Sequence, residues 1–137
     1  MVTKEEWNKD LELLGFYEVP DDELCVVAYP HNLGAEFRWV IVDGKVVSGC
    51  RYKEAPKQYR TMAEFTPIYQ MIQRIVDKSF FNPERVWVMD TCHMKNGEHK
   101  VLETGCFSCS GLYTCPVEPI VREVSRVALE EWKEYNE

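Results

Sequence analysis

The stretch AEFRWVIV-DG-KVVSGCRY, residues 35–52, decides how this chain folds. Asp-Gly between two β-rich runs is a strong short-range signal of a β-hairpin. A two-residue turn sets Glu36 opposite Arg51 and Gly49 opposite Arg38. Alternation then predicts a core face and a charged face, made respectively of Phe37, Trp39, Ile41, Val46 and Cys50, and of Glu36, Arg38 and Arg51.

A second hairpin is indicated by RVWVMDTCHMK (85–95), Asn96-Gly97 and EHKVLETG (98–105). Asn-Gly predicts another two-residue type I′ turn. That register places Asp90 directly opposite Glu103. It also places His93 opposite Lys100, on the face away from Asp90.

Helices are predicted before, between and after the hairpins. Thr3 and Glu6 form a capping box for a first helix that ends near Gly15, and a short strand follows at about 24–29. A second helix covers about 61–78, starting either at Thr61 or at Thr66-Pro67, and the last covers about 117–134. Together these elements predict one α+β domain, residues 1–137, in which an antiparallel sheet of two hairpins has its helices packed on one face.

The composition limits the class of protein. The 137 residues carry a net charge of −7 and are 45% hydrophobic, which fits one packed domain and disfavours general binding to nucleic acid or anionic membranes. No run approaches the ~20 apolar residues of a membrane span, and the N-terminus lacks a signal-peptide core. We therefore expect a cytoplasmic protein whose six cysteines are reduced.

The predicted pairing of Asp90 with Glu103 needs an explanation, because like charges directly opposed across two strands destabilise a sheet. Either one carboxyl is protonated, or both face water, or a cation lies between them. Oxygen ligands favour Mg²⁺ or Mn²⁺, and Mg²⁺ typically takes one or two carboxylates together with substrate phosphates. The alternative is a solvated hairpin face without a metal.

Three motifs in order resemble the C-terminal half of ATP-grasp domains, most closely the RimK-like branch of phages and bacteria. They are EFRWVIVDGKVVSGCRYK, VWVMD and VLETGCFSCSGLYTC, and the resemblance covers about residues 24–125. It implies that Asp90 and Glu103 hold the Mg²⁺ that bridges the phosphates of ATP. It also implies that Arg38 and Arg51 hold phosphate or an acyl phosphate. In the predicted register Glu36 would orient Arg51 through a charge-assisted hydrogen bond, and the alternative is an ordinary surface pair across the two strands.

Lys53 belongs to a basic group, with Arg51, Lys57 and Arg60, that fits either a phosphate funnel or solvated loop charge. Where the family has Asn two residues after the metal Glu, this chain has Gly105, which offers no side-chain oxygen. Tyr113 and Phe107 are predicted core residues, with stacking on adenine as the alternative.

No N-terminal lobe of an ATP-grasp enzyme is visible in the sequence. The resemblance therefore implies half, or a remnant, of an ATP-dependent carboxylate-amine (or thiol) ligase that is incomplete on its own, with ATP and Mg²⁺ as cofactors. A separate chain would supply the missing lobe. The alternative is a catalytically dead module that dimerises or binds a protein partner through the former nucleotide face.

A zinc site is the second alternative. Cys106-x-x-Cys109 and Cys115, with Cys92 and His93 across the hairpin, offer four ligands in principle. Phe107 inside the knuckle and the absence of a second Cys-x-x-Cys disfavour it, so buried reduced thiols remain the default interpretation.

Overall fold

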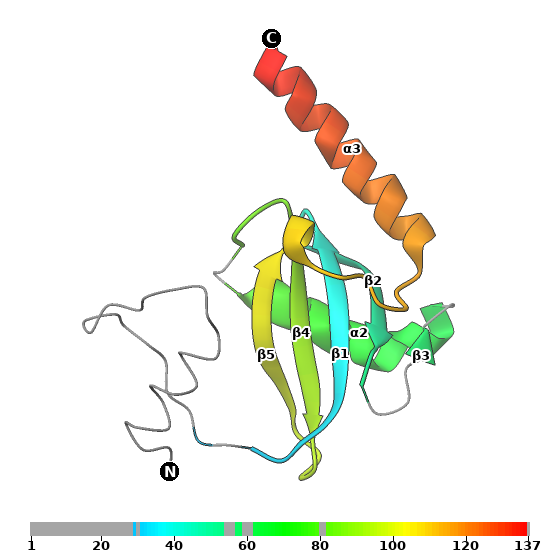
Figure 1. Ribbon diagram of the computed structural model, residues 1–137, viewed down its shortest axis with the longest axis vertical. Helices are drawn as coiled ribbons and strands as arrows, with labels where there is room; N and C mark the ends of the chain where they lie inside the picture. Colours follow the sequence, from blue (N-terminus) through cyan, green and yellow to red (C-terminus); the bar gives the residue numbers. More distant parts are fainter. Residues whose placement is uncertain (1–28, 30, 54–56, 59–61, 80–81, 137) are drawn as a thin grey trace, which may run out of the picture. The chain divides into compact units, whose positions relative to one another are not determined.

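The computed structural model describes residues 29, 31–53, 57–58, 62–79 and 82–136 (Figure 1). The predicted first helix and residues 24–28 of the predicted first strand lie outside these ranges. The chain divides into two compact units, Met1–His31 and Asn32–Glu137, and every element described below belongs to the second. Within the described residues, no helix combines the length and apolar character needed to cross a membrane.

The second unit is built on one antiparallel sheet with the strand order β3-β2-β1-β4-β5. Its strands are β1 (Leu33–Val42), β2 (Lys45–Arg51), β3 (Lys57–Gln58), β4 (Val86–Met94) and β5 (His99–Cys106). Its helices are α2 (Met62–Lys78), the short 3₁₀ turn η1 (Phe107–Cys109) and α3 (Val117–Asn136). The predicted α+β fold with two hairpins is confirmed.

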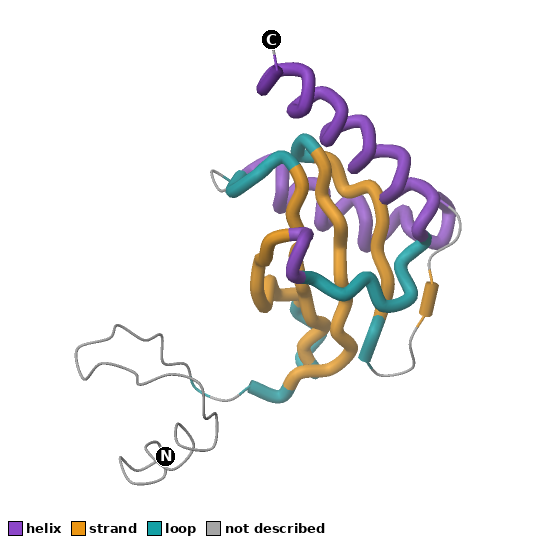
Figure 2. Tube along the Cα trace, turned by 45° about the horizontal axis from the view of Figure 1, so that its top comes forward, coloured by secondary structure: helices purple, strands orange, loops and turns teal. Residues whose placement is uncertain are grey.

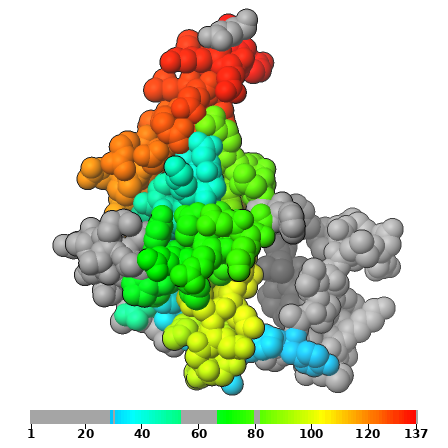
Figure 3. Space-filling model, turned by 180° about the vertical axis from the view of Figure 1, so that it is seen from behind, coloured from blue at the N-terminus to red at the C-terminus, as the bar shows by residue number. Residues whose placement is uncertain are grey.

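Strand β1 lies at the centre of the sheet and is buried on both faces. Phe37, Trp39 and Ile41 point to one face and pack against α2, which Figure 3 shows in green over that face. Val40 and Val42 point to the other face and pack against Ile120 and Val127 of α3. The helices therefore cover opposite faces instead of sharing one, as Figure 2 shows from a second angle. The cause is the unbroken apolar run 39–42, which leaves both faces of β1 in need of cover.

The first hairpin has the predicted turn but not the predicted register. Asp43 (φ 46°) and Gly44 (φ 72°) both have positive φ, as a type I′ turn requires. A bulge on β2 then pairs Val40 with Ser48, so that Val47 is the extra residue. Beyond it Arg38 faces Cys50, Trp39 faces Gly49 and Phe37 faces Arg51. The predicted pairs Glu36–Arg51 and Arg38–Gly49 are therefore wrong, and Cys50 belongs to the cluster on the α3 side.

The register of the second hairpin deviates from the prediction at two places, and the two shifts cancel. The loop holds three residues, since Gly97 N donates to Met94 O (2.9 Å) and Met94 N donates to Glu98 O (2.7 Å). Gly97 has φ 89°, which suits the left-handed end of such a loop. His93 consequently faces His99, not Lys100. A bulge at Leu102 restores the register, and Asp90 faces Glu103 as predicted.

Helix α2 agrees with the earlier of the two predicted starts. It runs from Met62 to Lys78 with Pro67 inside it. Gln73 fastens it to the first hairpin, because its Oε1 accepts from Val46 N (2.9 Å) and its Nε2 donates to Gly44 O (2.8 Å).

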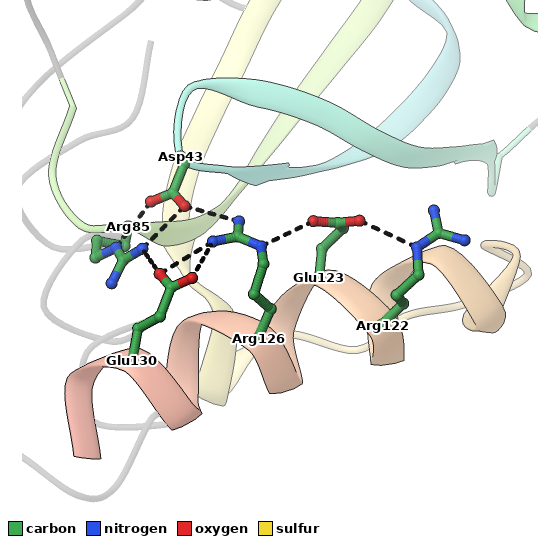
Figure 4. Close-up of polar contacts among 6 residues, drawn as sticks. All are labelled: Asp43, Arg85, Arg122, Glu123, Arg126 and Glu130. Atoms are coloured by element: carbon green, nitrogen blue, oxygen red, sulfur yellow. Dashed lines mark hydrogen bonds and ion pairs between the residues drawn. The ribbon is translucent and has the colours of Figure 1, made fainter. Parts of the chain in front are cut away.

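Helix α3 is tied to the first turn by a charged network (Figure 4). Asp43 accepts hydrogen bonds from Arg85 Nε (2.8 Å) and from Arg126 Nη2 (2.8 Å). Glu130 of α3 accepts from the same two arginines, at 2.6 Å from Arg85 and 3.0 Å from Arg126. Hydrogen bonds from Arg85 first and Arg126 second lower the pKa of Asp43 from 3.8 to about 2.

This network predicts an acid-sensitive contribution to stability. A lowered folded-state pKa stabilises the fold above the unfolded pKa, and the contribution is lost as the pH falls through the folded value. For Asp43 the loss is expected between pH 3.8 and about 2. Asp43→Asn should remove that part of the pH dependence in urea titrations at several pH values. If the free energy of unfolding of the variant falls with pH as steeply as that of the wild type in this range, Asp43 has no role in holding α3.

Candidate functional site

Four of the charged residues predicted from sequence lie on the face of the sheet that also carries α3. Glu36 and Arg38 come from β1, and Asp90 comes from β4, directly opposite Arg38 in the ladder. Glu103 comes from β5, opposite Asp90. Neighbours in register share a face, so Arg38, Asp90 and Glu103 form a row across three strands.

Arg38 and Asp90 form a bidentate ion pair. Arg38 Nε donates to Asp90 Oδ1 at 2.8 Å, and Nη2 donates to Oδ2 at 2.6 Å. Both side chains are buried, with 8% and 4% of their surface exposed. The hydrogen bond to Asp90 raises the pKa of Arg38 against the opposing effect of burial. A parallel two-bond pair of this kind fixes both side chains in one geometry.

Glu103 completes the row from the solvent side. Its side chain is 71% exposed, and its Oε1 lies 4.0 Å from Arg38 Nη2. The guanidinium nitrogen Nη2 therefore lies within ion-pair distance of both carboxylates. The cation that the opposed carboxylates require is thus supplied, in this structure, by an arginine of the neighbouring strand.

Two stacked tyrosines form a cradle beside Arg38. The rings of Tyr52 and Tyr113 lie 4.5 Å apart and 8° from parallel. Arg38 Cζ lies 4.8 Å from the Tyr113 centroid, within the range of a cation–π contact. Arg38 Nη1 also donates to Gly111 O at 2.7 Å.

Tyr113 is not the core residue that the sequence predicted. The residue is 58% exposed, and it has a positive φ of 48°. A left-handed backbone at a non-glycine residue is costly and recurs at functional sites. Phe107, the other predicted core aromatic, does pack partly buried against the α3-side cluster.

Glu36 has partners other than the predicted Arg51. Tyr52 donates its hydroxyl proton to Glu36 Oε2 (2.9 Å), and Lys53 forms an ion pair with Glu36 Oε1. Burial first, and Glu36 second, raise the pKa of Tyr52, so its hydroxyl stays protonated and donates. Arg51 is in register with Phe37, which places it on the opposite face from Arg38.

Gly105 lies two residues beyond Glu103 on the same face, opposite Val88. A Cβ there would lie 3.6 Å from Val88 Cγ2 and 3.7 Å from Ser110 Oγ, so the site has room for a small side chain at this point. Tyr52 and Gly111 are the site residues that sequence reasoning missed. Tyr52 had a signal, since it follows directly after the strand that carries the predicted arginine.

The cysteines predicted as zinc ligands do not come together. Cys115 is buried against Cys50, and Cys92 Sγ is buried 3.6 Å from the sulfur of Met94. Cys106 and Cys109 are exposed at the end of β5. Among the residues that the structure describes, no group of three or more His, Cys, Asp or Glu side chains is placed to hold a metal. That finding removes support for zinc. It leaves room for Mg²⁺, which needs only one or two carboxylates.

Two solved structures are similar to this chain. One is the C-terminally truncated Cdc123 from Schizosaccharomyces pombe, at 20% identity and a TM-score of 0.45, covering 69% of this chain and 39% of that one. The other is the ATP-grasp ligase PsnB complexed with precursor peptide PsnA2 and AMPPNP, at 14% identity and a TM-score of 0.33, covering 66% and 26%. The chain thus spans less than half the length of either protein.

No curated protein matches the chain. A family profile described as an ATP-grasp domain, the third family of its clade, matches residues 5–124, which is most of the sequence. With the motifs and the α+β sheet that carries them, this match shows that the chain belongs to this family of ATP-grasp domains.

Proposed function

We propose that the row Arg38–Asp90–Glu103 is a binding site for a nucleotide with its metal, ATP with Mg²⁺ or Mn²⁺. The observation that carries the proposal is the position of Arg38 Nη2, 2.6 Å from Asp90 Oδ2 and 4.0 Å from Glu103 Oε1. A positive charge is already stabilised between these two carboxylates, so the place is electrostatically suited to a cation.

The donor set fits a hard cation. Asp90 and Glu103 supply carboxylate oxygens, the ligands that Mg²⁺ prefers, and the exposure of Glu103 leaves one of them accessible from solvent. A metal bound there would compensate the negative charge of the phosphates. We include in this proposal that the chain belongs to the RimK-like branch of ATP-grasp domains.

The chain's own residues would bind and orient the phosphates. Arg38 offers a guanidinium held by Asp90, Gly111 and Tyr113. Lys53 adds a second, half-exposed cation beside Glu36. Arg51, predicted as a phosphate ligand, faces the other side of the sheet, so the proposed site does not include it.

The reaction class we propose is the ATP-dependent joining of a carboxylate to an amine or thiol, with another lobe completing the site. In such a reaction Arg38 would stabilise the negative charge that develops as a phosphoryl group moves to the carboxylate. No side-chain nucleophile is required. The family assignment supports this class.

The test is calorimetric titration of Mg²⁺·ATP into the protein, with Glu103→Ala beside Glu131→Ala. Both residues are exposed glutamates, so the two variants make the same charge change, at the site and on α3 respectively. We expect saturable binding that Glu103→Ala weakens at least about tenfold, a loss of ~1.4 kcal/mol, and that Glu131→Ala preserves. Chelation of the metal should have the same effect as Glu103→Ala.

Equal losses in both variants, or no heat at millimolar nucleotide, would contradict the proposal. The second candidate, an interaction module without nucleotide chemistry, would then be favoured. One observation supports that candidate. Helix α3 leaves large apolar side chains exposed along its length, namely Val121, Leu129, Trp132 and Tyr135.

A further inference from the structure

Two cysteines far apart in the sequence meet beneath the candidate site. Cys50 lies on β2 and Cys115 lies in the segment that leads into α3. Their Sγ atoms are 3.1 Å apart, and both residues are buried, with 0% and 1% of their surface exposed. No motif in the sequence links these two thiols.

We propose that Cys50 and Cys115 are a site of oxidative modification, at which a hydroperoxide converts the two thiols into a disulfide that fastens residues 110–116 to β2. A sulfur pair already in contact needs only a small displacement to bond. Both residues belong to well-packed parts of the fold, with Val40 and Ile120 in the same cluster, which favours this pairing over others.

The hydrogen bonds around the pair assign different roles to its two sulfurs. Cys115 donates to Cys50, and this bond lowers the pKa of the Cys50 thiol. The same contact, with burial, raises the pKa of Cys115. Cys50 is therefore the better nucleophile, and Cys115 keeps its proton until the second step.

The reaction balances with hydrogen peroxide as the oxidant. The Cys50 thiolate attacks one peroxide oxygen, which breaks the O–O bond, gives a sulfenic acid and releases hydroxide. The Cys115 sulfur then attacks the sulfenic sulfur, the S–S bond forms, and the hydroxyl leaves as water with a proton. Overall, two thiols are oxidised and one peroxide is reduced to two waters. A small neutral oxidant also suits sulfurs that a bulky disulfide reagent would not reach.

The cross-link would act on the neighbourhood of Arg38. Cys50 faces Arg38 in the β1–β2 ladder, and Cys115 Sγ lies 3.9 Å from the Arg38 carbonyl oxygen. The segment 110–116 also carries Gly111 and Tyr113, which both contact the Arg38 guanidinium. Joining Cys115 to β2 would therefore restrict the segment that holds this side chain. Formation of this disulfide does not depend on nucleotide binding.

The same chain offers a competing pair of thiols. Cys106 and Cys109 are both exposed: Cys106 directly precedes the 3₁₀ turn η1, and Cys109 is the last residue of that turn. Hydrogen bonds from Cys109 first and Ser108 second lower the pKa of Cys106. Peroxide reaches exposed thiols first. A sound test must therefore separate this surface pair from the buried one.

The experiment treats the full chain, and the variant Cys106→Ser/Cys109→Ser, with hydrogen peroxide. Remaining thiols are alkylated under denaturing conditions, and the peptides are mapped by mass spectrometry without reduction. We expect both proteins to yield a peptide pair joined through Cys50 and Cys115, with loss of alkylation at both residues. The joined pair should disappear after reduction, and the oxidised variant should unfold at a higher temperature than the reduced one.

Cys92 is an internal control, because it is buried beside Met94 and burial raises its pKa. Three results would overturn the proposal. They are full alkylation of Cys50 and Cys115 after peroxide, oxidation of either residue to a sulfinic acid without a cross-link, and a cross-link from either residue to Cys25 or Cys92.

Discussion

Replacing Arg38 with methionine is expected to lower the free energy of unfolding by about 3–5 kcal/mol, the usual range for removing one partner of a buried ion pair. The variant would leave Asp90, with 4% of its side chain exposed, as a buried carboxylate without its bidentate partner. Methionine keeps much of the aliphatic volume, so the loss reports charge and hydrogen bonds. Urea denaturation followed by tryptophan fluorescence measures it.

Two comparisons sharpen that result. Arg122→Met removes an exposed arginine that pairs with Glu123 on the same helix, and it should change stability little. Arg38→Met/Asp90→Asn removes both charges and should recover part of the loss, because no buried charge is then left unpaired. Near wild-type stability of Arg38→Met would mean that Asp90 is not held by Arg38.

Repeating the urea denaturation with Mg²⁺ present tests whether Asp90 and Glu103 bind a metal. If Asp90 and Glu103 accept a metal, Arg38→Met should gain stability from Mg²⁺, because a ligand that binds the folded state alone shifts the equilibrium toward it. The double variant lacks the Asp90 charge and should gain less. The wild type, whose carboxylates already hold Arg38, should respond weakly without nucleotide.

The pairing of Asp90 with Glu103 could be predicted from sequence, although the structure reaches that register by a different route. The two-residue turn at Asn96-Gly97 was wrong by one residue, and the bulge at Leu102 moved the register back by one. The pairing of Asp90 with Glu103 therefore depends on two deviations that cancel. His93, which lies between the two deviations, shows the uncorrected shift by facing His99.

In the first hairpin a single deviation is not compensated, so the predicted cross-strand pairs are wrong. Its Asp43-Gly44 turn was predicted correctly, and a single bulge at Val47 displaced everything beyond it. A bulge has no reliable signature in one sequence, since any residue can be the extra one. The prediction for Arg51 failed for this reason, because a one-residue slip moves a side chain to the other face.

The pairing of Asp90 with Arg38 could not be predicted from sequence, for a different reason. Turn rules fix the register within a hairpin, whereas Arg38 and Asp90 lie on β1 and β4, whose pairing joins the two hairpins. No local pattern specifies that register. The contact with Gly111 is likewise long-range, because it depends on how the segment after η1 crosses the sheet.

Replacing Gly49 with alanine is expected to destabilise the fold by about 1–3 kcal/mol or more, as overpacking of a core does. A Cβ at Gly49 would lie 2.3 Å from Trp39 Cε3 and 2.5 Å from Cζ3. The indole has little freedom to move away. It is fully buried, its Nε1 donates to Thr91 Oγ1 at 2.8 Å, and it stacks on Phe37 with 6.0 Å between the ring centroids.

Gly105→Ala is the matched control, because a Cβ at that strand position meets only ordinary contacts at 3.6 Å and beyond. Thermal unfolding of both variants then tests the register of β1 against β2. In the bulged register Gly49 faces the rigid indole of Trp39, and alanine is harmful. In the unbulged register that the sequence suggested, Gly49 would face Arg38, whose longer and more flexible side chain could shift aside. Equal stability of the two variants would therefore contradict the bulge at Val47, and with it the separation of Arg51 from the candidate site.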